Sequence, residues 1–181
     1  MVVYINRESY TSGNWSAAGN HSLERFMIET SKDAPHPEAA TLFDAWQGQQ
    51  PGEALRLGAL GSGSDYTVFL DHLGVPSLNV GYGSANGIYH SLYDTYYYYQ
   101  RFGDPGYKYG VAQADMVGRM VMRLANADIL PFDFTSASGV IAGYVDELVA
   151  MDEGGLLRDE LREIGAANAV INAAATETNG V

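Results

Sequence analysis

The sequence predicts an α/β fold with a parallel sheet, followed by a helical segment. Two short apolar runs, at residues 2–6 and 77–80, have the β-branched composition of buried strands. Segments with apolar residues at helical spacing stand between these runs and after the second one. Strands that alternate with helices are typical of parallel sheets, because each parallel strand needs a crossover connection to the next.

A helix is predicted soon after the first strand. Residues 9–20 are rich in turn-forming residues, and the next segment has Leu23, Phe26 and Met27 on one helical face, which predicts a helix over about 22–32. Proline, glycine and glutamine dominate residues 35–60. We expect a long surface excursion there, with about one helical turn near 41–46.

Three further segments have helical character. Asp65 can cap a helix over 65–73, which Gly74 ends just before the second strand. The strongest pattern predicts a helix over about 107–128, ending before Pro131. Beyond it, apolar residues recur at helical spacing on both sides of a Gly-Gly interruption at 154–155. The last part of the chain therefore reads as helical and separate from the sheet.

Composition excludes several classes of function. The chain has 181 residues, a formal net charge of -12 and only 10 Lys and Arg, and this balance disfavours nucleic acid as a partner. No apolar run reaches the roughly 20 residues that a membrane span needs, so we expect no membrane insertion. The absence of cysteine removes disulfides, thiolate zinc sites and cysteine nucleophiles. Any metal must be held by His, Asp and Glu.

The stretch GIYHSLYDTYYYY, at residues 87–99, raises the question whether His90 binds a ligand. His90 follows the second predicted strand and Glu8 follows the first, and the carboxyl ends of parallel strands meet at one edge of a sheet. Each residue also has a simpler interpretation. His90 suits a structural histidine bonded to a tyrosine or a backbone group, and Glu8 suits a solvated strand end. Asp94 suits either a partner that orients His90 or the cap of a local turn.

The glycine-rich run GSGSD, at residues 61–65, contains two serines that suit a nucleophile by type. It is not the strand-to-helix GxSxG elbow of the hydrolases. It also lacks the lysine that follows the glycines of a phosphate-binding P-loop. Considered alone, this run therefore assigns no chemistry.

Four segments in one order carry a resemblance to a known family: VVYIN, LGSGSDYTVFLDHLGVPS, YHSLYDTY, and the long run from DPGYKYG to LPFDF. Together they resemble the M28 zinc peptidases, in the branch of glutamate carboxypeptidases and transferrin receptors. The resemblance implies a doubly wound, mostly parallel sheet with flanking helices. It also implies two domains: residues 1–134 as the C-terminal half of a peptidase domain, and 135–181 as the start of a helical dimerisation domain.

The resemblance implies a peptidase site that holds two zinc ions. His90 matches the last zinc-binding histidine of the family, and Tyr89 matches the tyrosine that donates a hydrogen bond to the oxyanion of the tetrahedral intermediate. Glu8 stands where the family has an aspartate ligand, and the carboxylate oxygen is thus one methylene farther from the backbone. We expect His90 and Glu8 to face a common cleft with Tyr89.

The resemblance also implies a substrate-binding surface formed by Gly63, Ser64, Asn79 and Gly81. In the glutamate-specific carboxypeptidases the loop that corresponds to SLNVGYG carries arginines that receive acidic side chains. Here those two positions are Asn79 and Gly81, which have no charge. With Tyr82, Tyr89 and Tyr93 as the expected walls, the surface predicts neutral or aromatic substrate side chains.

Two functions follow, and the sequence leaves both open, so whether the chain is an enzyme stays uncertain at this stage. The family's first histidine, bridging aspartate and glutamate pair have no counterpart here, which predicts a partial zinc-dependent exopeptidase, inactive as the isolated chain and weak in zinc binding. The alternative is a non-catalytic, transferrin receptor-like module for binding or dimerisation. Expected partners are a peptide substrate and a second copy or the missing half, associating at an exposed apolar sheet edge. Family resemblance and the absence of cysteine favour an extracytoplasmic or secreted location.

Overall fold

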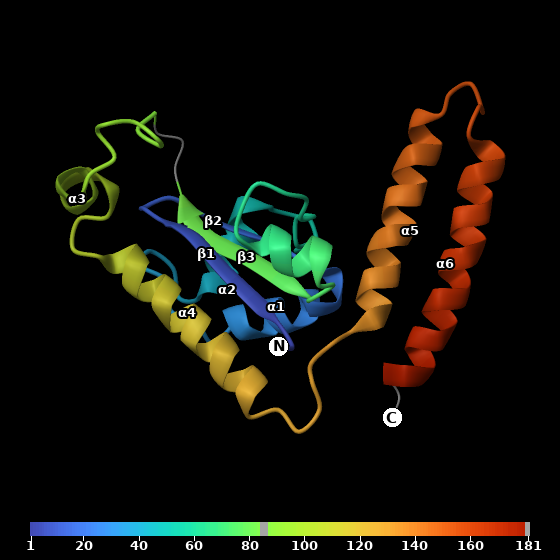
Figure 1. Cartoon of the computed structure of the whole chain (residues 1–181), viewed down its shortest axis with the longest axis horizontal. Helices are drawn as coiled ribbons and strands as arrows, with labels where there is room; N and C mark the ends of the chain where they lie inside the picture. The colour runs from blue at the N-terminus through green and yellow to red at the C-terminus, as the bar shows by residue number, and fades with distance from the viewer. Residues whose placement is uncertain (84–86, 180–181) are drawn as a thin grey trace.

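The structure, a computed structural model, describes residues 1–83 and 87–179, without the side chains of residues 8–10 and 179. A three-stranded mixed sheet has helices packed against one face, and a pair of long antiparallel helices stands beside it (Figure 1). The elements in order are β1 (Tyr4–Tyr10), β2 (Asn14–Gly19), η1 (His21–Leu23), α1 (Glu24–Ser31), α2 (Leu42–Gln49), η2 (Val68–His72), β3 (Ser77–Gly83), α3 (Tyr96–Tyr98), η3 (Tyr99–Gly103), α4 (Lys108–Ala125), α5 (Phe134–Met151) and α6 (Arg158–Asn179).

The sheet has the strand order β1-β3-β2. β1 and β3 are parallel neighbours, which confirms the predicted pairing of the two apolar runs and the α/β class. The prediction of turns throughout residues 9–20 was wrong, because β2 lies there and pairs antiparallel with β3. Its sequence, NWSAAG, has little intrinsic strand preference, and the ladder with β3 holds it in place.

One face of the sheet packs against α1, α2 and α4 to form the core. Leu78, Val80 and Tyr82 alternate along β3 and are all buried on this face. From α4, Met116 and Met120 pack into the same cluster. The predicted helices over 22–32 and 107–128 are thus confirmed, as η1 with α1 and as α4.

Residues 35–60 contribute to this core, and the prediction of a surface excursion was wrong in that respect. α2 runs beyond the single turn expected, with Thr41 capping its N-terminus by accepting a hydrogen bond from the amide of Asp44. Leu42 and Trp46 of this helix are buried, as are Leu55 and Leu57 after it. Four apolar side chains spread over sixteen residues do not stand out against the many glycines and prolines of the segment.

The opposite face of the sheet is covered by the segment from Gly61 to Val75. The ring of Tyr4, on β1, stacks on Phe69 with the centroids 4.0 Å apart. The helix predicted over 65–73 is present, but its main part, Val68–His72, has π-helical hydrogen bonding. The long connection between β2 and β3 therefore passes over both faces of the sheet.

Two buried carboxylates fix the segments that follow the sheet. Asp104, 1% exposed, accepts hydrogen bonds from the amides of Tyr109 and Gly110 and from the Tyr99 hydroxyl, so it holds the start of α4. Glu24 accepts from the Leu57 amide and from the Ser136 hydroxyl, which joins α1 to α5.

The α5–α6 hairpin has its own anchor points. Asp133 caps α5 through the amides of Thr135 and Ser136, which explains the aspartate of the LPFDF run. Between the helices, buried Asn168 donates to the carbonyl of Ser138 and accepts from its hydroxyl. α5 begins at Phe134, next to the expected domain boundary, and that division stays a prediction.

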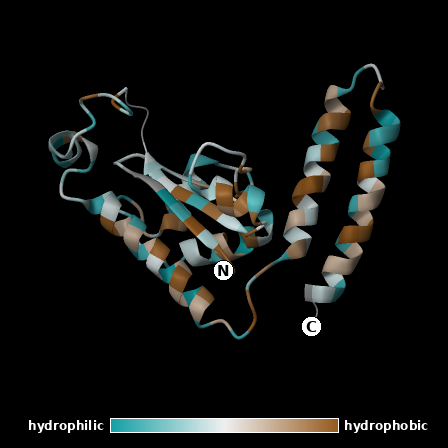
Figure 2. Cartoon of the chain, viewed as in Figure 1, coloured by the Kyte–Doolittle hydropathy of each residue, from teal (hydrophilic) through white to brown (hydrophobic). Residues whose placement is uncertain are grey.

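Apolar side chains remain exposed beside the edge strand β1 and on the α5–α6 hairpin, among other places. Within the described part of the chain β1 pairs with β3 alone, and Val2 beside it is 48% exposed. Figure 2 shows apolar residues along both helices of the hairpin. Exposed among them are Val149 and Met151 of α5 and Val170 and Ile171 of α6, and Leu156 and Leu157 are exposed in the connection between the helices. Among the described residues no helix has the length and apolar character that crossing a bilayer requires.

A titratable side chain packs against the core at His36. Its ring lies 5.5 Å from that of Tyr82, and its Nδ1 accepts a hydrogen bond from the Glu38 amide. Burial lowers the pKa of His36 from its ordinary 6.5, and the Glu38 carboxylate opposes this shift only in part. The folded protein therefore binds a proton at this position less readily than the unfolded chain.

We predict that the contribution of His36 to stability is complete above pH 6.5 and is lost as the pH falls through 6.5 towards the lower folded pKa. His36→Phe removes the titration and keeps a ring. The difference in melting temperature between wild type and His36→Phe, measured from pH 7.5 to pH 5, should shift in favour of the variant at the acidic end. His72→Phe, at an exposed position of η2, is the matched control. A difference that stays constant with pH would contradict the prediction.

Candidate functional site

Three polar side chains meet where the polar face of the β1–β3 pair lies under the glycine-rich loop. Asn6 and Asn79 are register partners on β1 and β3, and the side-chain amide of Asn6 donates to Asn79 Oδ1 at 3.0 Å. The same amide donates to Ser64 Oγ, 3.1 Å away. Two of the predicted substrate-binding residues, Ser64 and Asn79, thus share a hydrogen-bond partner although they are fifteen positions apart in the sequence.

The two glycines of the predicted surface occupy special backbone positions. Gly63 has φ +107°, a value that side-chain-bearing residues rarely adopt, and it shapes the turn that presents Ser64. Gly81 is buried in β3, where its carbonyl accepts a hydrogen bond from Ser16 Oγ. The two positions at which the resemblance implies arginines in glutamate-specific members are Asn79 and Gly81, and neither carries a charge in this chain.

Tyr89 and His90 lie on the loop that follows β3. Their rings stack with centroids 3.8 Å apart, and Tyr89 is 74% exposed. His90 has φ 60°, in the left-handed region that a residue with a side chain seldom occupies. The structure thus fixes both rings on the surface of the loop.

The tyrosine walls expected for the substrate-binding surface are present only in part. Tyr93 is exposed, and so are several other aromatic and apolar side chains of the loop, namely Leu92, Tyr96, Tyr97 and Phe102. Tyr82 was wrongly expected there, because it faces the helices and is 0% exposed. Burial, with a smaller effect from Tyr109, raises the pKa of Tyr82 above its ordinary value, as is typical of a phenol in the core.

The described residues do not by themselves fit a zinc site. No group of three or more His, Asp or Glu side chains gathers in the part of the chain with described side chains. The backbone of Glu8 is in β1, but its side chain lies outside the described part, so its approach to His90 stays a prediction. A histidine alone gives one of the three or four protein ligands that zinc requires.

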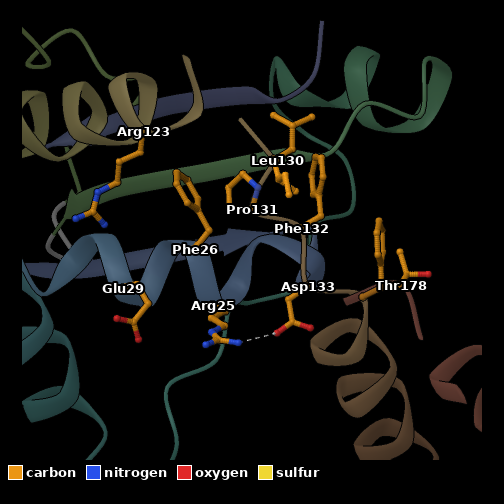
Figure 3. Close-up of a pocket in the computed structure, with 11 residues that line it drawn as sticks. Arg25, Phe26, Glu29, Arg123, Leu130, Pro131, Phe132, Asp133 and Thr178 are labelled. Atoms are coloured by element: carbon orange, nitrogen blue, oxygen red, sulfur yellow. Dashed lines mark ion pairs between the residues drawn. The ribbon is translucent and has the colours of Figure 1, made fainter. Parts of the chain in front are cut away.

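A separate cavity of about 530 Å³ lies between α1, the end of α4 and residues 129–134 (Figure 3). Phe26, Leu130 and Phe132 give it apolar walls, and Arg25 at its rim pairs with Asp133 at 3.9 Å. None of the predicted site residues lines it.

Asn6 is the residue of this surface that the sequence analysis missed. It was treated only as the last residue of an apolar strand. The available signal was an amide within the apolar run VVYIN, because an amide on a strand predicted to be buried needs hydrogen-bond partners.

We predict that Gly63→Ala destabilises the protein by about 1 to 3 kcal/mol, because alanine is strained at a positive φ. No atom lies within 4 Å of the Cβ that the substitution adds, so the cost arises from the backbone alone. Gly61→Ala is the matched control, since the space around it is equally open and its φ is not positive, and it should change stability by less than about 0.5 kcal/mol. Equal urea midpoints for the two variants would show that the turn is not strained.

Comparison with known proteins identifies relatives of the chain. A probable glutamate carboxypeptidase, LAMP1, of Arabidopsis thaliana is 34% identical over 139 residues, covering 75% of this chain and 20% of the relative. A probable glutamate carboxypeptidase of Arthroderma benhamiae is 34% identical over 157 residues, which cover 81% of this chain and 21% of the relative. The aminopeptidase NAALADL1 of Mus musculus is 26% identical over 162 residues, which cover 80% of this chain and 22% of the relative.

The chain spans about a fifth of the length of these curated relatives. No model of a protein family matches it. The relatives carry the names of glutamate carboxypeptidases and of an aminopeptidase, and their similarity extends over three quarters or more of this chain. The resemblance that the four sequence segments indicated is therefore confirmed, and the chain is a relative of the glutamate carboxypeptidase-like branch of the M28 peptidases.

Proposed function

We propose that this chain provides the substrate-facing part of a peptidase of the glutamate carboxypeptidase type. The observation that carries the proposal is the meeting of Asn6, Ser64 and Asn79 on the pair of parallel strands. Asn6 and Asn79 are the third residues of their strands, and residues 87–99 follow the carboxyl end of β3, where ligands of α/β folds bind. The relatives named as peptidases support a peptide as the substrate.

In this proposal Tyr89 and His90 act at the reacting bond. The phenol of Tyr89 is a hydrogen-bond donor of the kind that stabilises a developing oxyanion. The left-handed backbone at His90 is locally unfavourable, and such strain persists mainly where a side chain must be aimed in one direction. Their exposure in this chain means that other surfaces must enclose them before water is excluded from the site.

Zinc is the cofactor that we propose, with His90 and Glu8 as the ligands from this chain. A neutral imidazole suits zinc, and a carboxylate can complete its coordination. The remaining ligands would come from residues outside this sequence. Because the described side chains do not form a metal site by themselves, the chain alone would bind zinc weakly.

The substrate side chain next to the scissile bond would be uncharged. The polar cluster has amide and hydroxyl groups but no cation, and the net charge of -12 repels an anionic side chain. A glutamate- or aspartate-specific surface would need a guanidinium or ammonium group at this position. We therefore propose small, aliphatic or aromatic residues as the preferred class.

A second candidate function is a non-catalytic binding or dimerisation module. The observation that favours it is the α5–α6 hairpin, whose exposed apolar side chains suit contact with a second copy of the chain (Figure 2). The exposed position of His90 is also compatible with a lost metal site. An extracytoplasmic or secreted location is proposed for either function, on the resemblance and on the absence of cysteine.

We predict that His90→Ala abolishes the weak zinc binding of the chain at this loop, measured by isothermal titration with zinc chloride. His90→Gly should abolish it equally and also raise the melting temperature, because glycine relieves the left-handed strain. His72→Ala is the control for the loss of an exposed histidine. Unchanged zinc binding in both His90 variants, or tight binding of two ions by the wild-type chain, would contradict the proposed ligand role.

We predict that the assembled peptidase prefers Ala, Leu or Phe over Asp or Glu on the amino side of the scissile bond. The measurement is kcat/KM for a set of dipeptides that differ only in that residue. Asn79→Arg should shift the preference towards Asp and Glu, because it adds a guanidinium fork to the cluster. Asn126→Arg, at an exposed position after α4, is the control for added charge. A wild-type preference for acidic residues would contradict the proposed specificity.

A further inference from the structure

Asn6 occupies the centre of the polar cluster and is 6% exposed. Its amide nitrogen donates to Ser64 Oγ and to Asn79 Oδ1, and its Oδ1 accepts from the Tyr4 hydroxyl at 3.3 Å. The carboxamide of Asn6 thus contacts its own strand, β3 and the glycine-rich loop at once. A buried amide with partners for both of its ends has one orientation.

This orientation decides how the neighbouring groups can act. Because an amide nitrogen only donates, Ser64 Oγ and the oxygen of Asn79 must both accept on the side that faces Asn6. A hydroxyl that accepts one hydrogen bond keeps its own O–H as a donor. Within the described residues the Ser64 hydroxyl has Asn6 as its hydrogen-bond partner, and Ser64 is half-buried. Its proton is therefore not used within the cluster and is available to an acceptor from outside it.

We propose that Asn6 is a positioning residue, which makes the Ser64 hydroxyl a donor to the main-chain carbonyl of a bound peptide. The proposal rests on the function proposed above and deepens it by naming the group that reads the substrate backbone. The acceptor is expected to be uncharged for two reasons. None of the cluster side chains Asn6, Ser64 and Asn79 carries a positive charge that would attract an anion, and the carboxylate of Asp65, exposed next to Ser64, would repel one. Asn6 itself touches no substrate; it acts through Ser64 and Asn79.

The test replaces the donor of the cluster with an acceptor of the same shape. In Asn6→Asp the carboxylate accepts from the Ser64 hydroxyl, so that the proton turns away from the peptide. The probe is acetyl-alanyl-alanine amide, titrated into the ¹⁵N-labelled 181-residue chain. We expect the wild type to show shifts of the Gly63 and Ser64 backbone amides, and Asn6→Asp to bind about 3- to 10-fold more weakly, the loss of one hydrogen bond.

Two further variants separate positioning from general stability. Ser64→Ala, on the loop surface, should weaken binding by the same factor, and adding Asn6→Asp to it should cause no further loss, because the two act through one hydroxyl. Tyr4→Phe removes a contact of Asn6 but leaves its amide nitrogen, so binding should stay near the wild-type value. The side-chain NH₂ resonances of Asn79 should move in Asn6→Asp and stay in place in Ser64→Ala.

Several results would overturn the proposal. These are equal binding by the wild type and Asn6→Asp, additive losses in the double variant, or shifts of the wild type confined to residues away from 63–64 and 79. Near-UV circular dichroism confirms that each variant is folded. The titration needs neither metal nor peptide hydrolysis. An assembled protein without peptidase activity would therefore contradict the proposed function alone and would leave this test intact.

Discussion

The parallel pairing of β1 with β3 is the constraint on which the rest of the structure depends. Its register places Asn6 beside Asn79 on one face and Ile5 beside Leu78 on the other. The first face contacts the glycine-rich loop through Ser64 and η2 through Phe69, and the second forms the core with α1 and α4. A slip of one residue would move every side chain of β1 to the opposite face. The hydrophobic core and the polar cluster are thus set by the same ladder.

Elements with strong local patterns could be predicted from the sequence. β3 has an apolar run and α4 a clear helical stripe, and both lie where they were predicted. β1 was predicted at residues 2–6 and lies at Tyr4–Tyr10, because its polar second half is a strand only through its ladder with β3. β2 and α2 were missed or shortened for a physical reason. β2 is a strand because β3 offers it hydrogen bonds, and Gly19 fits because an added Cβ would lie 2.5 Å from Leu78. Such tertiary effects leave little trace in local composition.

The candidate site also has parts that the sequence predicts and parts that only the tertiary structure reveals. The association of Ser64 with Asn79 was available only through the family resemblance, and the structure adds the amide of Asn6 that joins them. Tyr82 was assigned to the wrong face because a loop interpretation of SLNVGYG ignores strand alternation, which extends to residue 83. The left-handed backbone of His90 had no signal in the sequence, since histidine adopts that conformation only where its surroundings impose it.

In the proposed function the reacting centre lies at the carboxyl ends of β1 and β3, with His90 on the loop after β3. The most direct measurement is a crystal structure of the chain grown with zinc, with anomalous diffraction recorded at the zinc absorption edge. We predict an anomalous peak within coordination distance of a His90 ring nitrogen, on the side of the loop that faces Ser64 and Asn79. A well-occupied peak bound only to other residues, with His90 turned away from the sheet, would contradict it.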